Sequence, residues 1–174
     1  SKKSLYLSSV RSFYFNLILS ERVAKQSWNR YQQNDRLLLA GTNSYFTLSE
    51  RSEEEINTTN VRLDQGDVHI GGMLAGASRG NDRDSRKLVC TEREGELIDS
   101  YPEFARLLEK NQVEPGVRAF RVVPEQLRVN LVDDTLDIEF KLPAGSFATS
   151  LLREFGEFKT EYSQLNTNEH SRER

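Results

Sequence analysis

The chain has few of the residues on which redox and metal sites depend. Among its 174 residues there are one cysteine, Cys90, and two histidines, His69 and His170. A single thiol excludes an internal disulfide and leaves no second thiol for a metal site, and it is typical of a reducing compartment, so we expect a cytoplasmic location. The histidines lie far apart without ligand spacing, so no metal is expected. We interpret His69 as a strand residue and His170 as part of a polar tail.

Long hydrophobic runs and nucleotide-binding motifs are also missing. The longest apolar run, residues 13–19, is interrupted by Asn16 and is far shorter than the roughly 20 residues that a membrane-spanning helix needs. No membrane partner is therefore expected. Neither GxxxxGK[ST] nor GxGxxG occurs, so no nucleotide cofactor is indicated. Hydrophobic content of 36% with 29% charged residues fits a globular protein of one domain or two small ones.

The N-terminal segment predicts an amphipathic helix with a local excess of positive charge. Because the chain begins with Ser1 and shows no signal-peptide pattern, we expect it to be a piece of a longer protein. A core helix is expected over residues 8–28, and its apolar stripe consists of Val10, Phe13, Tyr14, Leu17, Ile18, Val23 and Ala24. The positive residues are Lys2, Lys3, Arg11, Arg22, Lys25 and Arg30, against the single acid Glu21. Such an excess suits a phosphate-contacting face and is equally typical of a solvated helix.

The middle of the chain predicts alternating short strands and helices. A hairpin is expected from residues 37–40 and 45–48, because Gly41 and Asn43 between them favour a turn. Ser52 and Glu55 form a capping-box pattern, which predicts a helix towards residue 63. The further expected elements are a strand over 68–70, a helix over 88–99, a second capping box at 100–103 that opens a helix to 110, and a break at Pro115-Gly116.

Two consecutive segments between these elements predict loops. Residues 71–76 are rich in glycine and are expected to be too flexible for regular structure, which suits a ligand-binding loop but more often marks a plain connector. Residues 77–87 are polar, with four positive residues against two acids. Mobile basic loops often close on a nucleic-acid backbone, although many are merely solvated. The candidate RNA-backbone contacts in this loop are Arg79, Arg83, Arg86 and Lys87.

The C-terminal part predicts an antiparallel pair of strands. Apolar positions alternate over residues 127–131, and Asp133-Asp134 is a plausible turn into the next strand. That strand places Leu136, Ile138, Phe140 and Leu142 on one face and Asp137, Glu139 and Lys141 on the other, so we expect one face to be buried.

A sharp corner follows this strand. Pro143 ends the ladder, Gly145 permits the turn, and Ser146 is expected to be the N-cap of a helix that begins at Phe147. Backbone N–H groups at such a corner suit a phosphate or carboxylate, and the alternative, which physics alone favours, is a purely structural corner.

No self-contained catalytic centre emerges from these residues. Asp137 and Glu139 project from one strand face, as an acid/base pair would, but Lys141 shares that face and a solvated surface is the better explanation. Ser146 has no histidine placed to activate it, and GxSxG is absent.

Three segments carry a resemblance to a known family. They are residues 9–16 (SVRSFYFN), residues 39–41 (LAG), and residues 142–149 (LPAGSFAT) followed by Leu152-Arg153-Glu154. In order and spacing they resemble the TruD family of tRNA pseudouridine synthases over essentially the whole chain. The R-S-x-x-F-N and L-P-x-G-S-[FY]-A-T patterns are the specific ones.

The resemblance implies a mixed α/β (α+β) fold, a tRNA partner, and no cofactor or metal. Residues 1–120 would be an inserted helix-and-hairpin domain that grips RNA, residues 121–160 a strand, strand and helix returning to the catalytic sheet, and residues 161–174 a polar tail. The family isomerises a D-arm uridine of tRNA to pseudouridine: an aspartate initiates glycosidic cleavage, and the rotated uracil is rejoined through carbon. A base inside folded RNA must first be flipped out, which suits a two-domain clamp with basic faces.

The sequence departs from the family in one respect. The family's aspartate segment, G-x-K-D-x-x-A, and its N-x-F-G-x-Q-R-F-G segment are absent, so we expect no catalytic residue in this chain and a missing N-terminal catalytic portion as its partner. The site-lining or supporting residues implied by the resemblance are Arg11, Phe15, Asn16, Leu142, Pro143, Gly145, Ser146, Phe147 and Thr149. The alternatives are a stand-alone RNA-binding or interaction module without catalysis and, less favoured, a small hydrolase.

Overall fold

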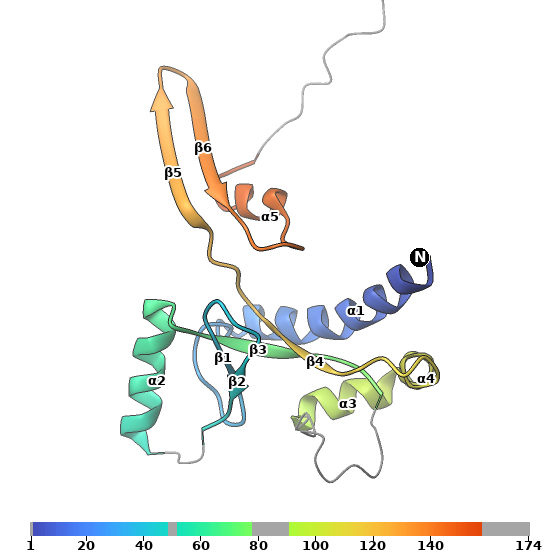
Figure 1. Cartoon of the computed structure of the whole chain (residues 1–174). Coiled ribbons are helices and arrows are strands. Elements are labelled where there is room, and N and C mark those ends of the chain that lie inside the picture. Colours follow the sequence, from blue (N-terminus) through green and yellow to red (C-terminus); the bar gives the residue numbers. More distant parts are fainter. Residues whose placement is uncertain (1, 49–51, 78–90, 158–174) are drawn as a thin grey trace, which may run out of the picture. The chain divides into compact units, whose positions relative to one another are not determined.

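The chain forms two compact units of mixed helix and strand (Figure 1). The computed structural model describes residues 2–48, 52–77 and 91–157, and it divides the chain into unit 1, Ser1–Arg121, and unit 2, Val122–Arg174. Unit 1 contains one antiparallel sheet and the helices α1 to α4, and unit 2 contains a two-stranded antiparallel sheet and α5. The mixed α+β class with antiparallel pairing agrees with the sequence-based expectation.

The sheet of unit 1 has the strand order β2-β1-β3-β4. Its strands are β1 (Arg36–Leu39), β2 (Tyr45–Phe46), β3 (Val68–Leu74) and β4 (Gly116–Ala119). The predicted hairpin is confirmed as β1 and β2, with Leu37 opposite Phe46. β4 is a finding that the sequence did not predict, because Pro115-Gly116 indicated a break, whereas the strand begins directly at Gly116 and pairs with β3.

The prediction of a flexible glycine loop over residues 71–76 is wrong for residues 71–74, which lie within β3, and Gly71 and Gly72 are buried there. A Cβ atom on Gly71 would stand 2.1 Å from Cδ1 of Leu38, and one on Gly72 would stand 2.3 Å from Cε1 of Phe120. The absence of a side chain therefore lets neighbouring groups pack directly on the strand. Glycine at these two positions therefore permits close packing of neighbouring side chains and does not make the strand flexible.

Alternate residues of β3 feed two hydrophobic clusters. Val68 and Ile70 pack with Leu37 and Leu63 in one cluster. The second cluster consists of Tyr14, Met73, Ala75, Leu97 and Leu108. Tyr14 comes from α1, Leu97 from α3 and Leu108 from α4, and Leu63 of the other cluster comes from α2. Every helix of unit 1 therefore contributes a residue to a cluster to which β3 also contributes.

Helix α1 (Lys2–Ala24) begins and ends earlier than predicted. It ends in a Schellman arrangement, in which the N–H of Ser27 donates to the carbonyl of Arg22 (2.8 Å) and Gln26 has a left-handed φ of 52°. Val23 is 53% exposed and Ala24 is also exposed, so the predicted core stripe is wrong at its C-terminal end. The buried α1 residues are Tyr14, Phe15 and Arg22.

The other helices of unit 1 show which capping patterns are used. The helix α2 (Glu53–Gln65) has the predicted cap, since Oγ of Ser52 accepts from the N–H of Glu55 at 3.2 Å. The predicted box at residues 100–103 is wrong: α4 (Pro102–Lys110) has Tyr101 at its N-cap without a side-chain bond. The complete capping box is instead that of Thr91 and Glu94 at α3 (Glu92–Ser100). This helix corresponds to the one predicted over 88–99, of which residues 88–90 lie outside the described part of the chain.

Unit 2 consists of β5 (Glu125–Val132), β6 (Thr135–Lys141) and α5 (Ala148–Leu152). The predicted antiparallel pairing is confirmed, with Val132 opposite Thr135 and Asp133 in a left-handed conformation at the turn. The prediction of a buried strand face is not met within the described part of the chain: Leu136 is 42% exposed, and Ile138 and Phe140 are only half-buried. A two-stranded sheet with one five-residue helix offers too little apolar surface to cover that face.

Candidate nucleic-acid interface

Arg11 belongs to the first family-like segment. Its side chain connects α1 to two other points of unit 1, one just after β3 and one just before β4. Its Nε donates to the carbonyl of Ala75, just after β3, at 3.1 Å, and its Nη2 donates to the carbonyl of Glu114, just before β4, at 3.0 Å. Burial, and secondly the positive charge of Arg118, lower the pKa of Arg11 from its usual value. Arg11 still stays charged, since arginine is protonated at any physiological pH, and it supports the fold through two main-chain oxygens.

Phe15 is a core residue, whereas Asn16 is exposed. The Phe15 ring is 4% exposed, and its centroid lies 5.6 Å from that of Phe120. The guanidinium carbon of Arg118 lies 5.3 Å from the Phe15 centroid, which is a cation–π distance. Phe15 therefore cannot offer its face to a base, while Asn16, next along the helix, is accessible.

Arg118 is a residue near this site that the sequence did not single out. It lies on β4 and is exposed, between the half-buried Val117 and Ala119. The alternation of that short strand is the signal that was available, but the expected break at Pro115-Gly116 concealed it. Only the placement of the strand shows that Arg118 adds a cation beside Arg11 and Phe15.

The third family-like segment, residues 142–149, forms a tight corner in unit 2. The N–H of Ser146 donates to the carbonyl of Pro143 at 3.1 Å, and Gly145 has a φ of +86°, which glycine adopts without strain. Leu142 and Ser146 are half-buried, and Pro143 and Gly145 are exposed. The predicted turn is confirmed, and the chain passes from β6 to α5 within it.

The N-cap predicted for α5 is wrong. Phe147, not Ser146, occupies that position, and no side chain caps the helix. Because α5 has only five residues, its dipole is small, and the anion-binding interpretation of the corner gains no support from it. The accessible groups at the corner are Phe147, which is 73% exposed, and Thr149, which is exposed as well.

The predicted residues therefore fall into two sets, one in each unit. Arg11, Phe15 and Asn16 lie on α1 in unit 1, and the residues from 142 to 149 lie in unit 2. The basic-loop candidates Arg79, Arg83, Arg86 and Lys87 lie outside the described residues.

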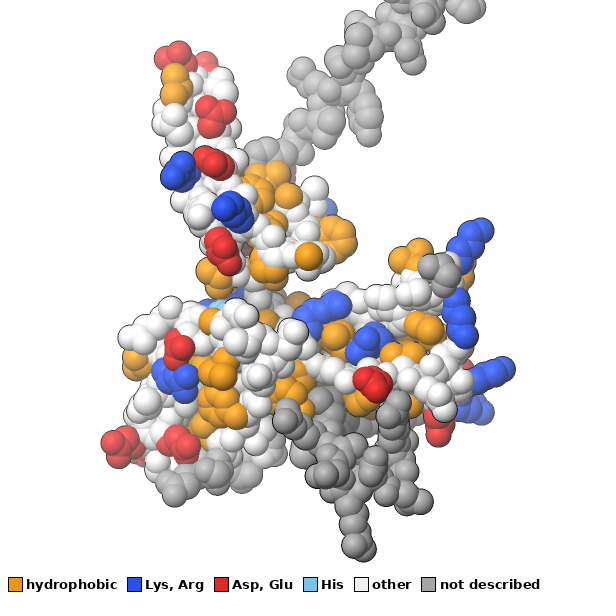
Figure 2. Space-filling model, in the orientation of Figure 1, with side chains coloured by type: hydrophobic (Ala, Val, Ile, Leu, Met, Phe, Trp, Pro, Cys, Tyr) orange, Lys and Arg blue, Asp and Glu red, His pale blue; other side chains and the backbone are white. Residues whose placement is uncertain are grey.

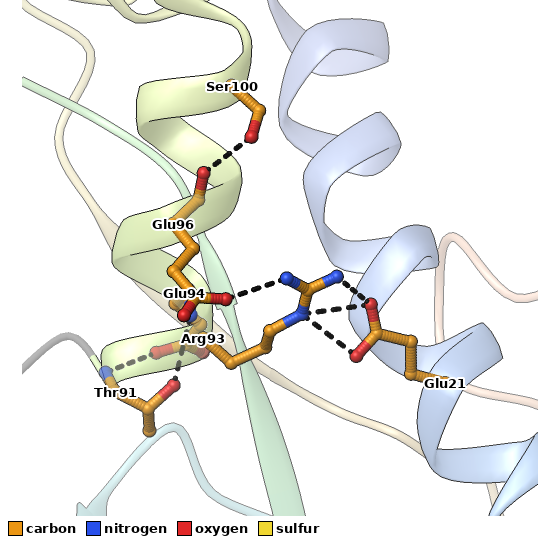
Figure 3. A network of polar contacts seen from close by, with 6 residues as sticks. All are labelled: Glu21, Thr91, Arg93, Glu94, Glu96 and Ser100. Atoms are coloured by element: carbon orange, nitrogen blue, oxygen red, sulfur yellow. Dashed lines mark hydrogen bonds and ion pairs between the residues drawn. The ribbon is translucent and has the colours of Figure 1, made fainter.

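Arg93 on α3 joins that helix to α1 (Figure 3). Nε of Arg93 lies 3.0 Å from both carboxylate oxygens of Glu21 on α1, and its Nη1 lies 2.7 Å from Glu96. The hydrogen bond from Arg93, the largest influence, lowers the pKa of Glu21. Because Arg93 is paired with two acids, it is a poor candidate for a nucleic-acid contact.

His69 and Arg121 form a second polar contact in unit 1. Nε of Arg121 donates to Nδ1 of His69 at 2.9 Å, and its Nη2 donates to the carbonyls of Leu63 and Val68. Because Nδ1 accepts this bond, the imidazole is neutral, with its proton on Nε2. Burial, followed by the charge of Arg121, lowers the pKa of His69. The contact joins the residue that ends unit 1 to β3 and indicates a structural role.

The sequence also raised the questions of an acid/base pair and of a metal site, and the described side chains are not arranged as either would require. Glu139 faces Arg128 across the strand pair at 3.5 Å, with both side chains more than three-quarters exposed, which agrees with a solvated face. Within the described ranges no three histidine, cysteine or acidic side chains gather as a metal site would require. In the same ranges no helix has the length and apolar character needed to cross a membrane.

Comparisons with known proteins give one consistent family. The family model of tRNA pseudouridine synthase D (TruD) matches residues 2–155. The protein named tRNA pseudouridine synthase D from Mannheimia succiniciproducens is 33% identical over 153 residues, which are 88% of this chain and 42% of that protein. Its namesake from Methylococcus capsulatus is 36% identical over 159 residues, 91% of this chain and 43% of that protein. The chain thus spans about two fifths of the length of these curated relatives.

A solved structure supports the fold. The crystal structure of a protein described as a candidate tRNA pseudouridine synthase D, from Methanosarcina mazei, superposes with a TM-score of 0.53 at 20% identity, covering 83% of this chain and 36% of that one. At this identity the likeness speaks for the fold alone. The family model, in contrast, covers most of the sequence, including all three family-like segments, and the chain therefore belongs to the TruD family of tRNA pseudouridine synthases.

Proposed function

We propose that this chain provides tRNA-binding surface and one wall of the active site of a TruD-type pseudouridine synthase, which isomerises a D-arm uridine. The observation that carries the proposal is the match to the TruD family over residues 2–155, combined with coverage of only 42–44% of the curated relatives. Since the 174 residues contain no G-x-K-D-x-x-A segment, the aspartate that initiates the reaction would belong to a different part of the enzyme.

The exposure of apolar residues in unit 2 supports this assignment. No described side chain of β5 or β6 is fully buried, and apolar residues such as Leu131 (69% exposed) and Leu136 face solvent. An isolated pair of strands is marginally stable, and further strands or helices normally complete such a sheet. We infer that β5 and β6 belong to the catalytic sheet and α5 to the same domain, whose remaining elements come from the portion that bears the aspartate.

Unit 1 would then be the inserted RNA-gripping domain. Its four-stranded sheet has its own two hydrophobic clusters, so it folds around an independent core. At the corner of unit 2, the exposed ring of Phe147 is suited to stacking on an extruded base, since aromatic faces bind bases of any sequence.

Assays with tRNA test this proposal. We expect the 174-residue chain to bind tRNA without forming pseudouridine, and we expect a longer form that also carries the aspartate segment to form it. Turnover by the chain alone would overturn the placement of the catalytic aspartate elsewhere. Binding by both forms with turnover by neither would favour the alternative, an RNA-binding module that has lost catalysis.

A further inference from the structure

One face of α1 carries a regular series of cationic and apolar residues. Lys3, Leu7, Arg11 and Phe15 are spaced four residues apart, so their side chains lie along one stripe of the helix. The first three, together with Ser4, Ser8 and Val113, line an open hollow of about 390 Å³. Figure 2 shows blue side chains along this helix with orange ones between them.

Arg118 extends the stripe from the neighbouring strand. β4 is an edge strand of the sheet, and the exposed guanidinium of Arg118 rests over Phe15, one helical turn beyond Arg11. Arg11 and Arg118 are close enough for the charge of Arg118 to lower the pKa of Arg11. Two positive charges are therefore held near each other. The contacts that hold each side chain do not neutralise its charge.

This arrangement differs from that of most of the other described arginines. Six of them pair with a carboxylate: Arg22, Arg30, Arg36, Arg62, Arg93 and Arg128. Among the described residues, by contrast, neither Arg11 nor Arg118 forms an ion pair with an acid, and Arg11 donates to backbone carbonyls instead. At Glu114 it is the main-chain oxygen that accepts from Arg11. Adjacent, uncompensated cations are what an external anion would stabilise.

We propose that Lys3, Arg11 and Arg118 form a track that binds the phosphate backbone of RNA. The inference rests on the proposed function, in which the ligand is tRNA. Lys3 and Arg11 are eight residues apart in α1, which is about 12 Å along a helix, so the track is long enough to follow more than one nucleotide. The guanidinium of Arg11 has several N–H donors, and its two backbone bonds leave some of them for a phosphate.

The track is suited to phosphate and not to base recognition. Its one aromatic ring, Phe15, is buried beneath Arg118 and offers no stacking surface. The two arginines are held in place by backbone bonds and by a ring, so little side-chain freedom is lost on binding. Contacts of this kind position an RNA without reading its sequence.

Salt-dependent binding of tRNA to the 174-residue chain tests the track. The variant Lys3→Gln with Arg118→Gln removes two cations, both without a hydrogen bond to other described side chains, and Arg118→Lys retains the charge. We expect the slope of log affinity against log salt to fall by roughly 0.7 to 0.9 for each phosphate that the double variant no longer neutralises, and to be retained in Arg118→Lys. The matched control, Arg106→Gln with Lys110→Gln on α4, removes two exposed cations from the same unit and should leave the slope unchanged.

The outcomes separate this inference from the proposed function. If the unaltered chain does not bind tRNA, the proposed function fails. If it binds, and the Lys3/Arg118 variant binds with the same affinity and salt slope, the track is overturned while the proposed function stands. A thermal unfolding curve for each variant confirms that the compared proteins are folded. Equal losses in the test and control variants would show that net charge, and not this surface, governs binding, which also overturns the track.

Discussion

Arg36 and Glu94 form a doubly hydrogen-bonded ion pair in the interior of unit 1, with Nη1–Oε1 at 2.8 Å and Nη2–Oε2 at 2.7 Å. Their side chains are 2% and 3% exposed. The same carboxylate accepts the backbone N–H of Met73 at 3.0 Å and that of Thr91 at 2.9 Å. A single acid thereby joins β1, β3 and the start of α3.

We expect Glu94→Gln to destabilise the chain strongly. The substitution leaves the buried guanidinium of Arg36 without this counter-charge, and breaking a buried pair in this way costs about 3–5 kcal/mol. Urea unfolding at neutral pH measures the loss. Glu96→Gln on the same helix is the control, because that side chain is 56% exposed and its removal should cost less than about 1 kcal/mol. Equal effects of the two substitutions would contradict the role assigned to Glu94.

The same carboxylate predicts a loss of stability in acid. Burial alone would raise the pKa of Glu94, but the hydrogen bonds and charge of Arg36 outweigh burial, and the pKa lies below its ordinary value of 4.5. The contribution to stability is therefore fully present above about pH 4.5 and is lost as the pH falls through the lower, folded-state pKa. The stability difference between the unaltered chain and Glu94→Gln should shrink on acidification below about pH 4.5. A difference that stays constant down to the acid unfolding of the chain would contradict this assignment.

Gly72→Ala should destabilise unit 1, because its Cβ would lie 2.3 Å from Phe120 Cε1 and 3.1 Å from Phe15 Cδ2. Overpacking of this kind costs about 1–3 kcal/mol. A Cβ on Gly95, within α3, would meet nothing within 4 Å, so Gly95→Ala should stabilise the helix by about 0.5–1 kcal/mol. Denaturant midpoints of the two variants should move in opposite directions. A midpoint for Gly72→Ala at or above that of the unaltered chain would refute the close packing described for β3.

His69 predicts a second pH dependence, near neutrality. Its folded-state pKa is lowered from the ordinary value of 6.5, first by burial and then by Arg121, so the unfolded chain binds a proton more readily. Stability should therefore be fully present above about pH 6.5 and fall as the pH drops from there towards the folded-state pKa. Thermal unfolding between about pH 7.5 and 5.5, on either side of the ordinary value, tests this. In His69→Gln the slope over this range should flatten, and an unchanged slope would assign the dependence to other groups.

The sequence predicted the elements whose signals are local. The turn at Asp133-Asp134 lies between two strands with alternating apolar residues, and it is found where expected. The helix start marked by Ser52 and Glu55 is also found where expected. The end of α1 was missed because Gln26 is an unusual residue for the left-handed position that closes a Schellman motif. The pattern over residues 100–103 failed as a cap because Tyr101 immediately precedes the helix and itself takes the N-cap position.

Features that depend on distant residues were beyond the sequence. The glycines of β3 indicated flexibility because nothing local shows that Leu38, Val117 and Phe120 pack on them. Likewise, the contact of Arg118 with Phe15 joins residues far apart along the chain and requires β4 to be in place. The site-lining residues, in contrast, came from the resemblance to TruD, since no charge or spacing near residues 142–149 shows a function, whereas the basic-loop candidates came from charge alone.

The substitution Phe147→Ala tests whether the corner of unit 2 contributes to tRNA binding or has only a structural role. The ring is 73% exposed and makes no ring contact with the described aromatic residues, so folding should be unaffected. If Phe147 stacks on an extruded base, its loss should weaken tRNA binding by about 1–3 kcal/mol, or roughly 5- to 150-fold. Filter binding of tRNA by the 174-residue chain measures this. Phe155→Ala, which removes a 40% exposed ring just beyond α5, is the control and should bind as the unaltered chain does. Unchanged binding in Phe147→Ala, or equal weakening in both variants, would leave the corner with a structural role only.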